Sequence, residues 1–524
     1  MGPSLAKPHS DVNPWVIAAT VMLATFMEVL DTSVANVSLP HIAGNLSASV
    51  DESTWVLTSY LVANGIILPM SGFLSLMFGR KRFYMTCVLL FTLSSVACGL
   101  APSLGLLVFF RILQGLGGGA LQPISQAILV ESFPQEKQGM AMAVYGMGVV
   151  VAPIIGPTLG GWITDNYSWR WIFLINIPVG ILSLAMTYLM VKDPPYLAER
   201  RQKKIRIDYG GIGLLVLGLA SFELMLDQGQ REDWFSSRMI VTAAVLAVLG
   251  LVAVVVWELR QKEPIVDFRM LKDRNFAIAT GAMFLLGFVL YSSTAMLPIY
   301  LQTLMGYNAT TSGEVISPGG IAIILMMPLV GRLVGKVDAR WLVIFGLSVS
   351  AAGLLQMAHF NLEIDFRTAV IARIVQSVGL AFLFIPINVS AFSSVPKEKT
   401  NYATGLVNLA RNFGGSSGIA LATTMLSRRS QFHQANMVGH LTPLDANYQS
   451  TLHGLTQALI QRGSDATQAL NQAQAMIYGM VQRQSMMRAF VDVFWLLAMV
   501  FLAVVPLVFL MKKVQPHKGP VMAE

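Results

Sequence analysis

The sequence has few charged residues for its length. Only 12% of the 524 residues are Asp, Glu, Lys or Arg, while 54% are hydrophobic. Soluble domains carry about 25% charged residues, so this deficit excludes an ordinary soluble protein and indicates a chain in contact with lipid.

Cysteine is also scarce. The two cysteines, Cys87 and Cys98, fall in one predicted helix, about 16 Å apart along its axis, which is too far for a disulfide bond.

Motifs for nucleotide-driven or metal-dependent chemistry are missing. The sequence contains no Gly-x-x-x-x-Gly-Lys-Ser/Thr loop, and its seven histidines are scattered without the spacing of a metal site. ATP is therefore excluded as the direct energy source, and we expect neither an enzyme nor a bound metal or cofactor. Catalytic turnover by the purified protein would revive the enzyme interpretation.

Long apolar runs dominate the chain. About 20 apolar residues in a helix cross the apolar core of a bilayer, and fourteen such runs can be placed along the sequence. The first run follows a polar segment and has no small-residue cleavage site after it, so we expect it to remain rather than be cleaved as a signal peptide. The sequence predicts an all-α polytopic membrane protein whose spans begin near Trp15, Thr54, Arg82, Leu104, Gln138, Trp169, Tyr209, Met239, Phe276, Thr311, Trp341, Phe366, Lys399 and Phe490.

The net charge of +8 is explained by topology. If the amino terminus is inside, most lysines and arginines fall in inner loops, whereas the short outer loops hold little beyond Arg231, Arg238 and Arg367. This is the positive-inside bias of membrane proteins, so no nucleic-acid partner is needed to explain the charge. We expect both termini and residues 192–208 in the cytoplasm, and residues 427–487 outside.

An internal duplication recurs at a constant spacing. Residues 132–137 recur as 394–399 and residues 111–117 recur as 373–379, in both cases 262 positions later. The copies lie eight predicted spans apart, and because eight is even they share one orientation in the membrane. Parallel repeats of this kind form two-bundle transporters, with the substrate between the bundles near the middle of the bilayer.

Two bundles of six helices leave two of the predicted spans over, and these form an inserted pair. We predict an amino-terminal six-helix bundle at residues 1–191 and a cytoplasmic linker at residues 192–208. The inserted helix pair follows at residues 209–258, and the carboxy-terminal six-helix bundle at residues 259–524. The last bundle includes the glutamine-rich segment 427–487, whose apolar residues recur at helical spacing. This favours an amphipathic helical insertion over disorder. The insertion is either a cover on the outer face or a docking surface for an extracytoplasmic partner.

Three of the charged residues within predicted spans lie at a similar depth in the first half of the chain. Glu28 and Asp31 lie on one face of the first helix, and Arg111 in the fourth span is at a similar depth. A charge in the middle of the membrane costs about 2.5 to 3.5 kcal/mol, so each is a candidate for function. Either Arg111 simply neutralises a buried carboxylate, or the three groups form a site that takes and releases a proton. We favour the second interpretation, because two carboxylates cannot both be fully paired with one arginine.

A glycine-rich stretch at residues 148–161 contains Pro153 and Pro157 within a predicted span. Small residues let helices pack closely in lipid, whereas the prolines remove backbone donors and permit a bend. The stretch is therefore either a packing surface or a bend that a rocking bundle uses.

The 29 methionines could line an adaptable hydrophobic pocket, although methionine in a span more often faces lipid or fills a gap.

Together these features resemble the fourteen-helix drug:proton antiporter branch of the major facilitator superfamily (EmrB/QacA type), over nearly the whole chain. Residues 30–40 are similar to its first-helix motif, residues 111–115 to its fourth-helix motif, and residues 169–178 to a pattern typical of the branch. The loop motif usually has an acid where this chain has Leu76, which puts its charge relay in doubt. The antiporter motif is matched by Gly148, Pro153, Gly156, Pro157, Gly160 and Gly161. The cytoplasmic loop motif is matched by Gly72, Gly79, Arg80 and Lys81.

The resemblance implies roles for individual residues. Asp31 is expected to be the proton-coupling acid, with Arg111 and Glu28 beside it. Spans one, four, nine and twelve are expected to line the substrate cavity. The contacts that this implies are Glu28, Asn36, Gln114, Tyr291, Gln376 and Asn388.

The resemblance further implies a proton-coupled multidrug efflux antiporter in the bacterial cytoplasmic (inner) membrane. It would export hydrophobic or amphipathic toxic compounds by alternating access, driven by the proton gradient without a cofactor. A periplasmic adaptor and an outer-membrane channel are expected partners if the host has two membranes. A proton-coupled uptake symporter and a non-transporting sensor of the same fold are the alternatives, and the sequence leaves the substrate unidentified.

Overall fold

The computed structural model describes residues 13–134, 137–193, 207–334, 336–393, 395–439 and 441–509. These residues form helices joined by short connections, with no strand among them, which confirms the all-α fold. The helices of the first half are α1 Pro14–Asn45, α2 Val50–Ser53, α3 Trp55–Phe78, α4 Arg80–Gly99, α5 Leu104–Gly118, α6 Leu121–Ser132, α7 Gln138–Asn166, α8 Trp171–Leu174 and α9 Asn176–Met190. Those that follow are α11 Tyr209–Gln228, α12 Arg238–Arg260, α13 Arg274–Thr303, α14 Ala309–Leu333, α15 Ala339–Met357, α16 Phe366–Phe392, α17 Thr400–Val438, α18 Ala446–Gln461 and α19 Ala466–Val508.

Twelve helical segments of the described residues are long and apolar enough to cross a membrane. A thirteenth is α7, whose two halves, Gln138–Pro153 and Ile155–Asn166, are bent by 42° relative to each other. The remaining predicted span, which begins near Lys399, corresponds to α17; this helix is not among those segments and buries the polar residues Asn408 and Arg411. The number fourteen therefore stays a prediction.

Short polar side chains determine where many of the helices begin. Asp208 accepts a hydrogen bond from the Gly211 N–H at 2.9 Å, and Asp273 accepts one from the Phe276 N–H at 2.8 Å. Such caps satisfy backbone donors that have no partner in the first helical turn. The turn from α3 to α4 depends on Gly79, whose φ of 86° is rarely adopted by residues with a side chain.

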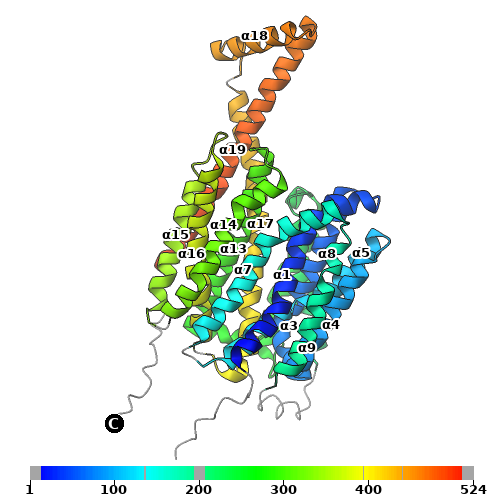
Figure 1. The fold of residues 1–524 in the computed structure, drawn as a ribbon, viewed down its shortest axis with the longest axis vertical. Helices are drawn as coiled ribbons and strands as arrows, with labels where there is room; N and C mark the ends of the chain where they lie inside the picture. Colours follow the sequence, from blue (N-terminus) through cyan, green and yellow to red (C-terminus); the bar gives the residue numbers. More distant parts are fainter. Residues whose placement is uncertain are drawn as a thin grey trace, which may run out of the picture.

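The helices form two groups that stand side by side (Figure 1). The first bundle contains α1 to α9, and the second contains α13 to α17 with α19. Their internal packing is equivalent, since α1 packs on α7 as α13 packs on α17, and α4 packs on α5 as α15 packs on α16. Contacts between the bundles match as well, because α7 packs on α14 and α17 packs on α3. This is the arrangement expected of two parallel repeats.

Helices α11 and α12 form the inserted pair and pack closely on each other. A Cβ at Gly218 would lie 2.9 Å from the backbone nitrogen of Leu251, and a Cβ at Gly250 would lie 2.7 Å from the Cα of Gly218. The two glycines therefore set the short distance between these helices, as small residues do in lipid. Helix α11 also contacts α3 of the first bundle and α17 of the second.

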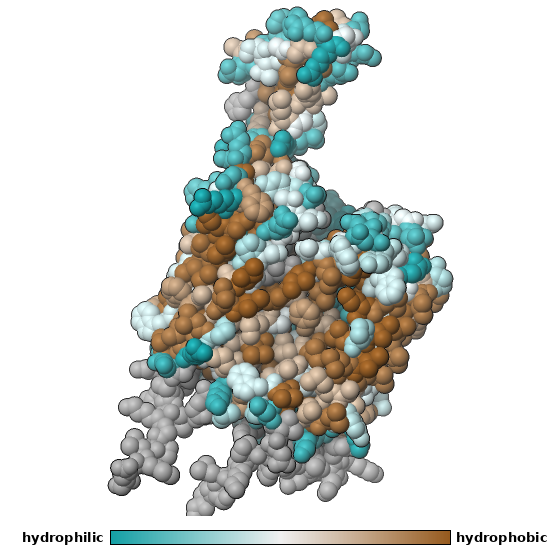
Figure 2. Space-filling model, viewed as in Figure 1, coloured by the Kyte–Doolittle hydropathy of each residue, from teal (hydrophilic) through white to brown (hydrophobic). Residues whose placement is uncertain are grey.

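The glutamine-rich segment is helical and projects from the body of the protein (Figure 1). We call this projection, residues 427–487, the tip. Helices α17 and α19 extend into it, and Leu452 of α18 packs with Ala473 and Ile477 of α19. Figure 2 shows mainly hydrophilic residues on the tip and a largely hydrophobic body. The helical structure predicted for this segment is confirmed.

The start of α1 and the end of α9 lie at the end of the body opposite the tip (Figure 1). This is the relative placement expected if the tip is outside and the amino terminus inside. The two termini themselves and residues 194–206 lie outside the described residues. Their cytoplasmic location stays a prediction.

Candidate functional site

Asp31 is buried where α1 meets α5 and α9. Its carboxylate accepts hydrogen bonds from Arg111 at 2.5 Å, from Gln114 at 2.9 Å and from Asn176 at 2.7 Å. Arg111 and Gln114 lie one turn apart on α5 and hydrogen-bond to each other at 2.8 Å. Asp31 is 3% exposed and Arg111 is fully buried. The ion pair is therefore screened little by water or salt.

Arg111 is held in place by groups other than the carboxylate. Its Nε donates to the Val56 carbonyl at 3.0 Å, and its guanidinium carbon lies 4.2 Å from the centre of the Tyr60 ring and 5.6 Å from that of Phe173. Contacts of this kind with aromatic faces favour a desolvated cation. Because arginine stays protonated in proteins, any change of charge within the pair must occur at Asp31.

Glu28 lies one turn before Asp31, and its partners are neutral. The carboxylate accepts hydrogen bonds from the Tyr60 hydroxyl at 3.2 Å, from Asn64 at 3.0 Å and from Gln122 at 2.6 Å. The sequence left open how two acids would share one arginine. The structure pairs that arginine with Asp31 and surrounds Glu28 with dipoles.

The Glu28 site continues into the second bundle. Gln122 of α6 donates to Glu28 through its amide nitrogen and accepts a hydrogen bond from Arg411 of α17 through its amide oxygen. Arg411 is 2% exposed. Sequence reasoning missed this residue, although a single arginine within a predicted span was a signal that could have found it. Gln122 carries no such signal, because neutral polar residues are common in helices.

A second polar contact joins the bundles beside this one. Gln126 of α6 hydrogen-bonds to Asn388 of α16, and Asn408 of α17 donates to the Gln126 oxygen at 2.7 Å. All three side chains are buried. The structure thus places Asn388, a predicted cavity residue, in a closed contact between the bundles.

The second bundle repeats part of the Asp31 network without the acid. Arg373 lies 262 residues after Arg111 and hydrogen-bonds at 2.8 Å to Gln376, its neighbour on α16. Gln376 donates in turn to Ser293 at 2.7 Å, and Ser293 lies 262 residues after Asp31. Arg373 forms no ion pair with any residue that the structure describes. The two arginines are therefore equivalent in position but not in charge balance.

The other predicted cavity residues are placed differently. Gln114 belongs to the Asp31 network, and Gln376 is fully buried in the equivalent network of the second bundle. The Tyr291 ring lies against α17, because a Cβ at Gly415 would be 2.4 Å from it. Asn36 is exposed on α1 and is not brought into either network.

The glycines of the antiporter motif bring α7 against α1, which carries both acids. A Cβ at Gly156 would lie 2.3 Å from the Ser33 hydroxyl oxygen, and one at Gly160 would lie 2.8 Å from Val34. Gly148 faces the flexible end of a methionine, and a Cβ at Gly161 would have a contact at only 4.0 Å. Gly156 and Gly160 are thus the positions where close packing requires glycine.

The prolines of the same motif account for an unusual hydrogen bond. Pro157 has no N–H, so the carbonyl of Pro153 lacks its usual helical donor. The Ser33 hydroxyl of α1 donates to that carbonyl at 3.2 Å. Because α7 is bent by 42° in this region, the motif combines the two properties predicted for it, a packing surface and a bend.

The loop motif contributes a glycine and a leucine to the body of the protein. A Cβ at Gly72 would lie 3.0 Å from the backbone of Asn401 and Tyr402, so α3 and α17 touch at this point. Leu76 is 1% exposed and lies within the hydrophobic core. The position where the family usually has an acid is therefore a packing position in this chain.

The basic residues of the loop motif hydrogen-bond to other segments of the first bundle. Arg80 donates two hydrogen bonds of 2.8 Å to the carboxylate of Glu131 at the end of α6. The backbone N–H of Lys81 donates to Asp193, beyond the end of α9, at 2.7 Å, whereas the Lys81 ammonium donates to the Tyr188 carbonyl at 2.5 Å. Glu131 is thus the acid that neutralises Arg80, although the usual acid of the motif is replaced.

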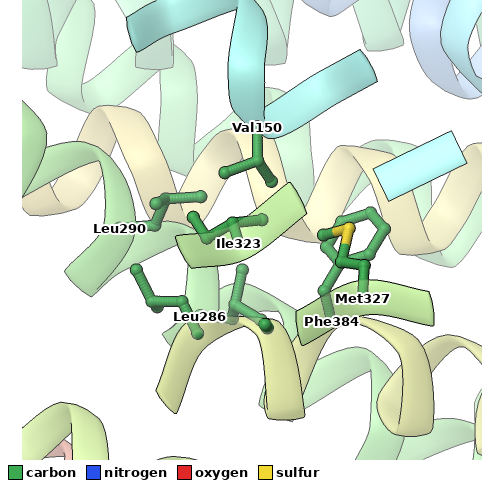
Figure 3. A pocket seen from close by; sticks show the side chains of 8 residues that line it. Val150, Leu286, Leu290, Ile323, Met327 and Phe384 are labelled. Carbon is green, nitrogen blue, oxygen red and sulfur yellow. The ribbon is translucent and has the colours of Figure 1, made fainter. Parts of the chain in front are cut away.

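A small apolar cavity lies between the bundles. Its volume is about 10 Å³, room for about one water molecule, so the structure holds no space for a drug-like compound there. Leu290 lies 262 residues after Glu28, so the equivalent position is acidic in the first bundle and apolar in the second. Figure 3 shows the lining residues Val150 of α7, Leu286 and Leu290 of α13, Ile323 and Met327 of α14, and Phe384 of α16.

Known proteins share this fold and much of this sequence. Residues 21–419 match the family model of the Major Facilitator Superfamily. The chain is 36% identical over 507 residues to the Multidrug export protein EmrB of Escherichia coli (strain K12), covering 97% of each chain. It is 38% identical over 502 residues to the Fatty acid resistance protein FarB of Neisseria gonorrhoeae, covering 95% of this chain and 96% of that protein. A crystal structure of a double-tryptophan XylE mutant has a TM-score of 0.63 at 14% identity, covering 96% of both chains. This chain therefore belongs to the major facilitator superfamily of membrane transporters.

Proposed function

We propose that this protein is a proton-coupled multidrug efflux antiporter of the bacterial cytoplasmic (inner) membrane. The observation that carries the proposal is the buried ion pair between Asp31 and Arg111. A carboxylate in this position can exchange its cationic partner for a proton, which is the step that couples transport to a proton gradient. The names of the relatives, which refer to multidrug export and fatty acid resistance, favour the outward export of toxic compounds.

Protonation changes what Asp31 can hold together. As a carboxylate it accepts hydrogen bonds from Arg111, Gln114 and Asn176, and so ties α1 to α5 and α9. A protonated Asp31 has no charge, and Arg111 would then be a buried cation without a counter-ion, which is strongly unfavourable. Helix α1 must therefore shift relative to α5 until Arg111 reaches water or another acceptor. Proton binding is thereby linked to movement of α1.

This movement reaches the substrate site through Glu28 and the antiporter motif. Glu28 is one turn from Asp31 on α1 and is connected to the second bundle through Gln122 and Arg411. Helix α7 packs on α1 and also on α14 of the second bundle. A shift of α1 is therefore transmitted to the interface at which the bundles rock to expose the site alternately on each side of the membrane.

The chemistry of this interface favours hydrophobic or amphipathic substrates. The apolar part of a substrate would occupy an opened form of the cavity beside Leu290 (Figure 3). Its polar or cationic part would approach Glu28, with Gln376, Asn388 and Tyr291 as further contacts once the bundles separate. The proton gradient supplies the energy, and no cofactor takes part.

The tip is proposed as the docking surface for a periplasmic adaptor that leads to an outer-membrane channel. It presents exposed apolar side chains between its polar residues, including Leu444, Leu470 and Met480. This assignment places the tip outside, with both termini and residues 192–208 in the cytoplasm.

Reconstituted protein in liposomes tests the function directly. With an imposed pH gradient, ethidium or a neutral hydrophobic dye should move uphill, and adding the dye without a gradient should release protons in the opposite direction. Proton and dye movement in the same direction would show an uptake symporter. Dye binding without any flux would identify a sensor, and either result would overturn the proposal.

A further inference from the structure

Helix α11 of the inserted pair carries a buried acid that the coupling step above does not use. Glu223 is 6% exposed and lies five residues before the end of the helix at Gln228. Ser416 of α17 donates a hydrogen bond to its carboxyl group at 3.2 Å. On the other side, a Cβ at Gly65 of α3 would lie 3.9 Å from the Glu223 side chain. Glu223 is therefore in contact with both bundles.

Neighbouring residues of α11 join the same two helices. Asp227, one turn after Glu223, hydrogen-bonds to Thr58 of α3. The Phe222 ring packs against Phe413 of α17, with ring centres 4.7 Å apart. Helix α11 thus bridges the bundles along one to two turns near its end. A rocking movement that separates α3 from α17 must break contacts on one side of this bridge.

Glu223 has no cationic partner among the residues that the structure describes. The charged group that acts on Glu223 is Asp227, an exposed acid one turn further along α11. The packed helices contribute other titratable groups, but none of them hydrogen-bonds or pairs with Glu223. The titratable groups on these packed helices are Tyr60 of α3, Arg238, Glu258 and Arg260 of α12, and Tyr402, Arg411, Arg428, Arg429 and His433 of α17. A carboxylate buried in this way lacks the charge balance that Asp31 has.

We propose that Glu223 is a second proton-binding site, carried by the inserted pair, whose protonation holds α11 against α17 and keeps the bundles together at the end bearing the tip. A neutral carboxyl group can stay buried between Ser416 of α17 and Gly65 of α3. A charged one in lipid without a partner is unfavourable, so loss of the proton favours a separation that admits water. Asp227, exposed one turn away, gives the proton a polar route to the surface.

The proposal predicts the sign of a pH effect. Because the closed contact binds a proton that the open contact releases, the closed population is favoured at low pH and falls as the pH rises. One linked proton changes the closed-to-open ratio by up to about tenfold per pH unit. The proposal rests on the alternating access proposed above, but Glu223 and Asp31 act at separate places and can be tested separately.

Spin labels on the two bundles can measure this contact. Cysteines are introduced at Gly44, at the end of α1, and at Gln302, near the end of α13, which are both exposed. The native cysteines are buried, and labelling of the parent protein checks that they stay unreactive. Pulsed electron–electron distance measurements between pH 5.5 and 8.5 should show a short-distance population that declines as the pH rises. The ratio of the two populations should change at least about tenfold.

Four variants separate the contribution of Glu223 from a general loss of packing. Glu223→Gln should keep the short distance across the whole pH range, whereas Glu223→Asp should retain the pH response. Glu232→Gln, at an exposed acid after α11, is the matched control and should behave as the parent. Ser416→Ala should lower the short-distance population at every pH while the response remains. A parental response in Glu223→Gln, or no effect of Ser416→Ala, would overturn the proposal.

The Asp31→Asn background distinguishes this site from the coupling site. Uphill transport should be lost in that background, yet the pH-dependent distance change should persist and should still be abolished by Glu223→Gln. If Asp31→Asn alone removes the distance change, the second proton site is wrong while the coupling role of Asp31 stands. If Asp31→Asn still pumps uphill, the coupling assignment fails regardless of how Glu223 behaves.

Discussion

Gln126 and Asn388 are 262 residues apart, the spacing of the internal repeat, and their side chains hydrogen-bond to each other. Equivalent positions in two repeats meet only near the axis that relates the repeats, so this contact marks the axis at the bundle interface. Both side chains are buried, and Asn408 adds a further hydrogen bond. In this structure the centre of the protein is therefore a closed polar contact rather than an open substrate cavity.

The same repeat shows where the two bundles have diverged. Arg111 and Arg373 are equivalent and both buried, but the position of Asp31 is occupied by Ser293 in the second bundle. Of these two equivalent sites, only the one in the first bundle contains an acid whose protonation changes its charge. The first bundle is accordingly the one in which we locate coupling.

Replacing Asp31 with asparagine should abolish proton-driven transport of every substrate. The variant keeps the size of the side chain but cannot bind and release a proton, and its amide nitrogen donates hydrogen bonds where the carboxylate accepted them. Substrate binding should persist, because Asp31 is enclosed by Arg111, Gln114 and Asn176 rather than by the cavity. Uphill transport and equilibrium binding in the same preparation check this prediction, and proton-coupled pumping by the variant would contradict it.

Glu28→Gln should be milder and selective. The partners of Glu28 are neutral donors, so replacing it with glutamine breaks no ion pair. Loss of the negative charge should weaken transport of a cationic compound more than that of a neutral one. Initial rates for one compound of each kind provide the measurement, with Asp31→Asn as the comparison. Equal loss toward both compounds would show that the two acids do not have separate roles.

Arg411→Gln should impair transport at least about tenfold. Arg411 donates to Gln122, which holds Glu28, and hydrogen bonds to charged groups contribute about 1.5 to 3 kcal/mol. Arg428→Gln on the same helix, at an exposed position, is the control and should stay within about twofold of the parent because exposed charges contribute little. Uphill flux in proteoliposomes is the measurement. Identical behaviour of the two variants would mean that the contact between the bundles has no role.

Two adjacent glycines of the antiporter motif should differ in their effect on stability. A Cβ at Gly160 would lie 2.8 Å from Val34, including close contacts with its backbone, whereas one at Gly161 would be 4.0 Å from its nearest neighbour. Gly160→Ala should therefore destabilise the protein by about 1 to 3 kcal/mol through overpacking, and Gly161→Ala should be close to neutral. Thermal unfolding in detergent compares the two. A neutral Gly160→Ala would show that α1 and α7 are not closely packed in the membrane.

Deleting residues 439–482 and joining the ends with a short flexible linker should spare flux but reduce resistance in cells. Gln434 of α17 hydrogen-bonds to Tyr478 of α19 at 2.9 Å, so the two helices are close enough to be joined there. The deleted part packs on itself and not on the body. Proteoliposome flux and whole-cell resistance are measured in parallel. Equal loss in both assays would mean that the tip is structural and would remove the case for an adaptor.

The sequence was enough to identify the membrane class, the duplication and a group of charged residues at similar depth. These follow from composition, from spacing along the chain and from helical periodicity, none of which requires knowing how the helices pack. The depth argument placed Arg111 near Glu28 and Asp31, but distance along a helix does not say which acid the arginine faces. Only the packing of α1 against α5 and α9 decided that Asp31 takes Arg111 and that Glu28 is left with neutral donors.

Contacts between the bundles were decided by tertiary structure alone. Gln122 meets Arg411 and Gln126 meets Asn388 because two halves of the chain associate about an axis. No local pattern in the sequence predicts which side chains such an axis brings opposite each other. The same holds for Glu223, whose environment is formed by α3, α11 and α17, helices that are far apart in the sequence. Asn36 shows the reverse case: it lies in a recognised motif, yet the rotation of α1 leaves it exposed, because the buried face of a helix is selected by what packs against it.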